Sequence, residues 1–256
     1  MVNEFYKRTL YCIKIIASLL NFNSLKKISI SLLISQVKMI GPDSVSVTII
    51  TAFFIGMVLS LQVVKEFLYL NAIHLIGSVL TIAFLRELSP VLTIVIAIGR
   101  ICSAFTAELG TMIITEQIDA FYLLGINPII YLVIPRIISF VMMLPILNIF
   151  SIVTSLTSSA FICLLFYDID PRIFWLSSYR VLSVVDILKS SIKIIILGIL
   201  VSIISCAWGL ATHGSTKNIG LAITSSVVTC LLCLFIVDFI LSYFMFSTFS
   251  STFQFV

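Results

Sequence analysis

Arg86-Glu87-Leu88-Ser89-Pro90-Val91 interrupts a long apolar run, and two further polar motifs follow, Ala107-Glu108-Leu109-Gly110-Thr111-Met112 and Thr115-Glu116-Gln117-Ile118-Asp119-Ala120. Four of the chain's eleven acidic residues lie in these three motifs. A charged group placed beside apolar sequence carries a solvation cost, so such groups mark positions where function or a specific partner compensates for that cost. This stretch therefore indicates an apolar helical protein whose functional residues are its scarce charges.

The composition places the whole chain in a membrane. Of its 256 residues, 61% are hydrophobic and only 10% are charged, whereas soluble domains have about 45 to 50% apolar and about 25% charged residues. A helix needs about 20 predominantly apolar residues to cross a bilayer. We therefore predict an all-α integral membrane protein with about five transmembrane helices, at residues 45–68, 76–100, 129–166, 187–210 and 221–248. Pro135 and Pro145 leave open a hairpin within the third span, which would raise the count to six.

The amino-terminal region is basic and partly apolar. Six of the fifteen basic residues precede the first long apolar run: Lys7, Arg8, Lys14, Lys26, Lys27 and Lys38. The apolar residues Phe5, Ile13, Ile16 and Leu20 recur at roughly helical spacing. We predict an amphipathic, interfacial segment at residues 1–44 on the cytoplasmic or equivalent face, with a merely solvated basic tail as the alternative. Residues 45–248 then form one transmembrane permease domain, and residues 249–256 form a carboxyl-terminal tail.

No catalytic or metal-binding motif is present. The sequence has no phosphate-cradling P-loop and no HExxH or GxSxG motif, and its two histidines, His74 and His213, are far apart. Cys230 and Cys233 form a lone CxxC inside an apolar run, so we interpret the cysteines as small buried apolar residues. We expect no enzymatic activity, no metal and no cofactor in this chain. The basic cluster indicates a membrane surface and not nucleic acid as the partner.

The segment at about residues 101–128 is too polar for a span but has a helical pattern. Glu108, Met112, Glu116 and Asp119 are spaced by four, four and three residues, so they share one face if the helix continues through Gly110. Like charges at this spacing repel one another. An acidic face of this kind predicts a basic partner, and a solvated face without a partner is the alternative.

Arg86 and Glu87 pose a separate problem, because neighbouring residues on a helix point about 100° apart and pair poorly. Each needs a partner elsewhere in the bundle. Among charges within the other spans, Lys193 and Asp238 are the candidate counter-charges, which gives a hypothetical cluster of two acids and two bases. A purely structural ion-pair cluster is the alternative to a functional one.

These motifs resemble those of permeases of the MlaE/YrbE type, the membrane subunits of ABC transporters that move phospholipids with MCE-domain proteins. The resemblance extends from about Gly41 to Phe246 and includes Gly125-x-x-Pro128 and Pro135-Arg136. It implies an amino-terminal interfacial helix, five transmembrane helices, a homodimer and a cytoplasmic coupling helix that docks on a separate ATPase subunit. Ser89 stands where the family usually has Gly, and the loop Gly214–Gly220 lacks the usual acid.

The resemblance also assigns roles to particular residues. It implies that Glu108, Thr115, Glu116, Gln117, Asp119 and Gly125 couple the permease to the ATPase. It places the family's intramembrane charges at Arg86, Glu87, Lys193 and Asp238. Two copies would form a lipid-accessible cavity in which Arg86 or Lys193 meets a lipid phosphate.

The sequence thus predicts a permease subunit that moves phospholipid or a related lipid, with ATP bound by its partner. Its partners would be an ABC ATPase, an MCE-domain lipid-binding protein, a second copy of itself and membrane phospholipid. The alternatives are an ion- or proton-coupled carrier that uses Glu87 and Asp238, and a scaffold that anchors soluble partners. The absence of a convincing signal or transit peptide favours a plastid (chloroplast) membrane or a bacterial inner membrane.

Overall fold

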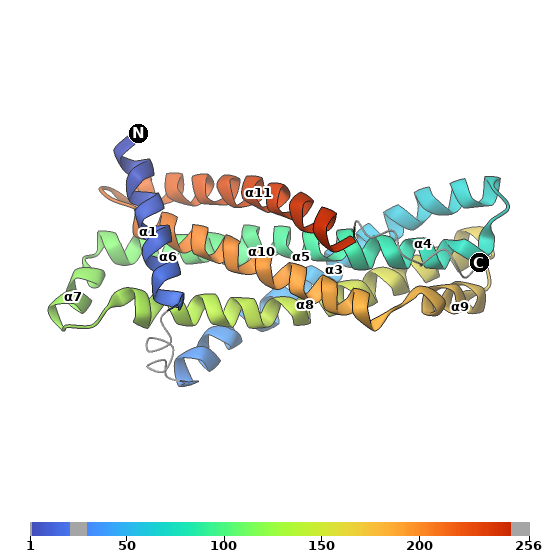
Figure 1. Ribbon diagram of the computed structural model, residues 1–256, viewed down its shortest axis with the longest axis horizontal. Helices are drawn as coiled ribbons and strands as arrows, with labels where there is room; N and C mark the ends of the chain where they lie inside the picture. Colours follow the sequence, from blue (N-terminus) through green and yellow to red (C-terminus); the bar gives the residue numbers. More distant parts are fainter. Residues whose placement is uncertain (1, 21–29, 247–256) are drawn as a thin grey trace. The chain divides into compact units, whose positions relative to one another are not determined.

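The computed structural model describes residues 2–20 and 30–246 of the chain (Figure 1). Lys26, Lys27, the side chain of Phe5 and the tail predicted at residues 249–256 lie outside what the structure describes. Every regular element within the described ranges is a helix, which confirms the all-α prediction.

The helices follow the apolar runs of the sequence. In chain order they are α1 (Val2–Leu20), α3 (Ile30–Tyr69), η1 (Ile73–Leu75), α4 (Ile76–Ala83), η2 (Phe84–Leu88), α5 (Ser89–Ala97), η3 (Ile98–Cys102), α6 (Ser103–Ile114), α7 (Gln117–Leu123), η4 (Ile129–Val133), α8 (Ile134–Tyr167), α9 (Pro171–Val181), α10 (Val184–Leu210) and α11 (Thr216–Phe246). The elements η2, η3 and η4 are single π-helical turns: η2 and η3 lie inside the second span, and η4 begins the third. Such turns accommodate one extra residue and occur often at functional positions.

Five helical stretches in the described residues are long and apolar enough to cross a membrane, as predicted. They are Ser44–Tyr69, Ile73–Ile114, Ile129–Tyr167, Val184–Leu210 and Thr216–Met245. The count is five and not six, because Pro145 lies inside α8 without ending it. The second span is longer than predicted: the helix continues beyond residue 100 to Ile114, so Glu108 belongs to it.

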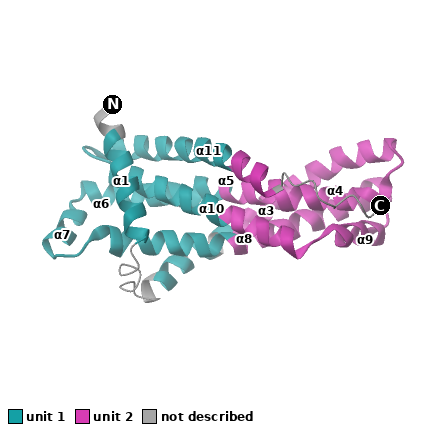
Figure 2. Cartoon of the chain, in the orientation of Figure 1, with its two compact units in different colours: residues 1–44, 95–144, 195–237 teal, residues 45–94, 145–194, 238–256 magenta. Residues whose placement is uncertain are grey.

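The chain forms two compact units, and each contains portions of the long helices (Figure 2). Unit 1 comprises residues 1–44, 95–144 and 195–237, and unit 2 comprises residues 45–94, 145–194 and 238–256.

Unit 2 is held together by an apolar core and by close helix approaches. Val64, Leu80, Phe84 and Leu156 are among the buried side chains of this core. At Gly77, on α4, an added Cβ would overlap the backbone oxygen of Phe174 on α9. Small residues allow this proximity, as in other membrane helix pairs. The helix α9 falls where the sequence predicted only a loop, although Asp170 followed by Pro171 is a helix-start signal.

Unit 1 joins α1 to the carboxyl-terminal half of α10. The guanidinium of Arg8 lies 5.4 Å from the ring centroid of Trp208, and Ile15 is fully buried. Ile13, Ile16 and Leu20, three of the predicted apolar-face residues, remain exposed. Exposed apolar side chains on a basic helix suit a membrane surface, so the interfacial placement of α1 stays a prediction.

Candidate functional site

Lys193 is the centre of a charged cluster in unit 2. Its side chain has no exposed surface. Its Nζ donates hydrogen bonds to Glu87 Oε2 at 2.7 Å, to Ser242 Oγ at 2.7 Å and to the Arg86 carbonyl at 3.1 Å. Ser242 in turn donates to Glu87 Oε2 at 3.0 Å. The three N–H donors of one ammonium group are therefore all used.

Pro90 explains why the Arg86 carbonyl is available to accept a hydrogen bond from Lys193. Pro90 has no backbone N–H, so it cannot make the helical bond to the carbonyl four residues before it, which is that of Arg86. The π-helical turn η2 ends at Leu88, two residues before this proline. A long cationic side chain from α10 thus takes a carbonyl that the local sequence leaves without its usual donor.

Asp238 is the second acid beside Lys193. Its Oδ1 lies 3.0 Å from Nζ, and its side chain is 13% exposed. This oxygen has no hydrogen bond, because the geometry of the contact is that of an ion pair only. The predicted pairing of Lys193 with Glu87 and Asp238 is therefore present.

The side chain of Arg86 has an ion-pair partner that was not predicted. Its Nη2 lies 3.3 Å from Oδ2 of Asp186, in the first turn of α10. Asp186 lies one residue before the span predicted at 187–210, so it was not among the predicted partners. A signal was available, because Ser183-x-x-Asp186 resembles a capping box: the Asp186 N–H donates to Ser183 Oγ, and that hydroxyl donates to Asp186 Oδ2.

Together these groups form a partly buried charge cluster, which we call the ionic cluster: Arg86, Glu87, Asp186, Lys193 and Asp238. Glu87 is its most accessible member, with 45% of its side chain exposed. Buried ion pairs are costly to break but add little net stability over apolar packing. The net stability that the cluster adds over apolar packing is therefore expected to be small.

The second predicted site divides into two parts. The helix survives Gly110 but α6 ends at Ile114, and Glu116 adopts a left-handed conformation with φ of 57° before α7 begins. The predicted face shared by Glu108, Met112, Glu116 and Asp119 is therefore wrong, because the chain changes direction between the second and third residues of that set. β-Branched Ile114 and Thr115 disfavour helix only weakly, so no strong signal announced this break.

Glu108 has a partner inside unit 1. Its Oε2 lies 2.9 Å from Nη2 of Arg136, whose side chain is only 5% exposed. Arg136 belongs to the Pro135-Arg136 motif near the start of α8, for which the sequence predicted no partner. The charge of Glu108 is therefore compensated within the protein, in contrast to the charges of Glu116 and Asp119.

Local signals shape the segment after the break, which we call the connecting segment, residues 115–127. Gly125, with φ of 72°, ends α7 in a Schellman arrangement: its N–H donates to the Tyr122 carbonyl, and the Ile126 N–H donates to the Phe121 carbonyl. Asn127 Oδ1 then accepts from the Ile129 N–H and caps the next helix, with Pro128 in its first turn.

The connecting segment presents both acidic and apolar side chains. The predicted coupling residues Thr115, Glu116, Gln117, Asp119 and Gly125 are all exposed. Leu123 and Leu124 are 90% and 72% exposed, while Ile118 is buried and anchors α7. Within the described residues, Glu116 and Asp119 form no ion pair or side-chain hydrogen bond.

The remaining reactive groups show no further site. All six cysteines are free, and no group of three or more His, Cys, Asp or Glu side chains in residues 2–20 and 30–246 could hold a metal ion.

Five apolar spans, charged side chains within them and an exposed segment between the second and third spans define a helical integral membrane protein. The chain matches the family model described as permease MlaE over residues 33–244, and it belongs to that family. It is therefore an ABC transporter permease and an integral membrane protein.

Named relatives agree with this assignment. The chain is 50% identical over 226 residues to the probable ABC transporter permease protein ycf63 of Pyropia yezoensis, covering 88% of this chain and 86% of the relative. It is 44% identical to the probable ABC transporter permease protein slr1045 of Synechocystis, with 83% and 81% covered. It is 42% identical to protein TRIGALACTOSYLDIACYLGLYCEROL 1, chloroplastic, of Arabidopsis thaliana, with 83% and 61% covered. The predicted plastid or bacterial membrane agrees with these sources.

Proposed function

We propose that this permease moves phospholipid or a related glycerolipid and is driven by a separate ATPase subunit that docks on the connecting segment. The observation that carries the proposal is the exposed pair Glu116 and Asp119 beside Leu123 and Leu124, in a chain that belongs to an ABC permease family. Apolar residues surrounded by charges are typical of protein interfaces.

The lipid part of the proposal draws on two supports. The name of the Arabidopsis relative contains a glycolipid, trigalactosyldiacylglycerol. In unit 2, the ionic cluster contains two cations, Arg86 in the second span and Lys193 in the fourth, and both spans are predominantly apolar. An exchange of Arg86 contacts, including its pair with Asp186, would let its guanidinium bind a lipid phosphate, which guanidinium groups bind in bidentate geometry. A homodimer and an MCE-domain partner complete the proposed assembly, in line with the family resemblance.

The first experiment is purification of the tagged protein from its native membrane in mild detergent, with identification of its companions by mass spectrometry. Recovery of an ABC ATPase supports the proposal. The complex is then reconstituted in vesicles and assayed for transfer of a fluorescent phospholipid, with ATP or a non-hydrolysable analogue.

Two variants sharpen the transfer assay. Arg86→Ala should abolish ATP-dependent transfer, and Arg180→Ala, which alters an exposed arginine of α9, should leave it unchanged. Transfer that continues without ATP and without an ATPase would instead support an ion-coupled carrier. Unaltered transfer by Arg86→Ala would remove Arg86 from the lipid pathway.

A further inference from the structure

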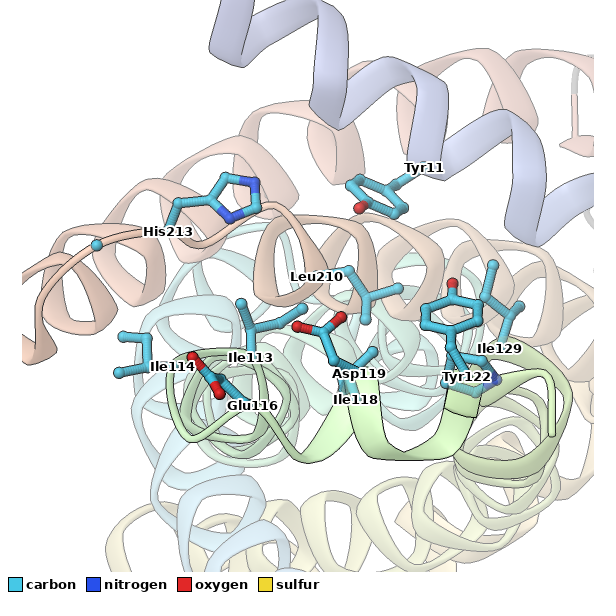
Figure 3. A pocket seen from close by; sticks show the side chains of 12 residues that line it. Tyr11, Ile113, Ile114, Glu116, Ile118, Asp119, Tyr122, Ile129, Leu210 and His213 are labelled. Carbon is cyan, nitrogen blue, oxygen red and sulfur yellow. The ribbon is translucent and has the colours of Figure 1, made fainter. Parts of the chain in front are cut away.

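Unit 1 contains a pocket of about 320 Å³ where three candidate spans end, near Ile114, Ile129 and Leu210 (Figure 3). The side chains around it come from α1, from the α6–α7 turn, from α7 and from the loop after α10. Its polar lining consists of Tyr11, Glu116, Asp119, Tyr122 and His213.

One side of this pocket is suited to a cation. Glu116 and Asp119 supply two carboxylates, and Tyr11 and Tyr122 supply aromatic rings with hydroxyl groups. Burial raises the pKa of the Tyr11 phenol, and the nearby Tyr122 and Asp119 raise it further, so Tyr11 stays neutral. Carboxylates beside aromatic rings bind ammonium and guanidinium groups by charge and by cation–π contact.

The other side has the opposite charge. A second cavity of about 220 Å³ shares Tyr11 and His213 with the first and adds Lys7 and Lys14. The Nζ atom of Lys14 lies 5.7 Å from the centroid of the Tyr11 ring. The α7 side of the two adjoining cavities is therefore acidic and the α1 side is basic. A partner protein that complements both sides must present a basic group next to an acidic group.

We propose that the Tyr11–Asp119 pocket receives a lysine or arginine side chain of the ATPase subunit, with an acidic neighbour of that side chain facing Lys7 and Lys14. The inference rests on the proposed function and deepens it, because it makes α1 one wall of the ATPase-binding surface. The exposed Leu123 and Leu124, at the carboxyl end of α7, favour a protein occupant, since they extend the contact area beyond one charged group. The amino-terminal helix thereby becomes part of the coupling apparatus.

The test measures the affinity of the purified ATPase subunit, identified by copurification, for the full-length permease in lipid nanodiscs. Asp119→Lys, Lys14→Glu and Tyr11→Ala alter the acidic side, the basic side and the shared wall. Each should weaken binding about tenfold, as expected for the loss of a close charge or anchor contact. Glu66→Lys and Lys65→Glu, at adjacent exposed positions of α3 in unit 2, serve as matched controls and should change the affinity less than twofold. Thermal unfolding of every variant separates loss of contact from loss of folding.

The outcomes distinguish this inference from the proposed function. If the ATPase binds the unaltered permease but only Asp119→Lys weakens it, docking involves α7 without the pocket, and the inference is overturned. Pocket variants that change binding of phosphocholine vesicles, and not of ATPase, would reassign the pocket to a lipid headgroup and also overturn it. If the ATPase does not bind the unaltered permease, the proposed function itself fails.

Discussion

The ionic cluster of unit 2 and the connecting segment of unit 1 use acids in opposite ways. In the cluster, Glu87 and Asp238 share one fully buried ammonium group, that of Lys193. In the connecting segment, Glu116 and Asp119 are exposed and form no ion pair among the described residues. A charge that is compensated internally specifies the shape of its own protein, whereas an exposed and unpaired one is available to a partner. The two regions should therefore respond in opposite ways to neutralisation.

Removal of the Lys193 ammonium should have the largest effect. Lys193→Met leaves Glu87 and Asp238 without their shared cation and should lower the free energy of unfolding by about 3 to 5 kcal/mol. Thermal unfolding in detergent measures this loss. Lys65→Met, at an exposed position of α3, is the control and should cost little.

The same variant can be rescued if the explanation by charge is correct. Adding Glu87→Gln and Asp238→Asn to Lys193→Met removes the uncompensated acids and should recover much of the loss. If the changes in the free energy of unfolding caused by the three substitutions simply add up, the three residues do not interact energetically.

The Glu108–Arg136 pair is the intermediate case, with one partner buried and the other partly hydrated. Glu108→Gln leaves a guanidinium that is only 5% exposed without its carboxylate, and should cost about 1.5 to 3 kcal/mol. Arg136→Met leaves the more exposed carboxylate and should cost less. A larger loss from Arg136→Met, measured by the same unfolding assay, would mean that arginine packing matters more than charge.

Close packing in unit 2 gives a prediction that involves no charge. Gly77→Ala places a methyl group against the Phe174 carbonyl and should cost about 1 to 3 kcal/mol. Gly99→Ala is a matched control, since a Cβ at Gly99 meets no atom within 4 Å, and this change should be neutral or stabilise the helix. Equal effects at both positions, seen by thermal unfolding, would contradict the close approach of α4 and α9.

Features that depend on a single segment could be predicted from the sequence. Apolar runs predicted the five spans, and the scarcity of charge within them led from Glu87 to Lys193 and Asp238. Features that depend on partners outside those runs were missed. Asp186 lies at the edge of its span, so a search confined to apolar windows excluded it, and Arg86 consequently had no correct partner.

Segment ends were predicted less well for a related reason. Glu108 and Gly110 make the sequence after residue 100 less apolar, so the predicted second span ended at residue 100, too early. Its true length is explained by Arg136, which pairs with Glu108 from another helix. The left-handed residue after α6 is Glu116 and not the glycine that such a position favours. The sequence therefore contained no signal that predicts this turn.

This same glutamate offers the smallest predicted change in stability and the sharpest contrast with the ionic cluster. A non-glycine residue in the left-handed region costs roughly 1 to 2 kcal/mol, so Glu116→Gly should raise stability by about 1 kcal/mol. It should nevertheless weaken ATPase binding, because it removes one of the two exposed carboxylates. Glu116→Gln keeps the backbone strain and removes only the charge, so it should weaken binding without the gain in stability. Unfolding and binding measured on both variants separate the two effects. If Glu116→Gly stabilises the permease and binding of the ATPase is undiminished, the acid at this position serves neither folding nor docking, and the proposed contrast between the two regions fails.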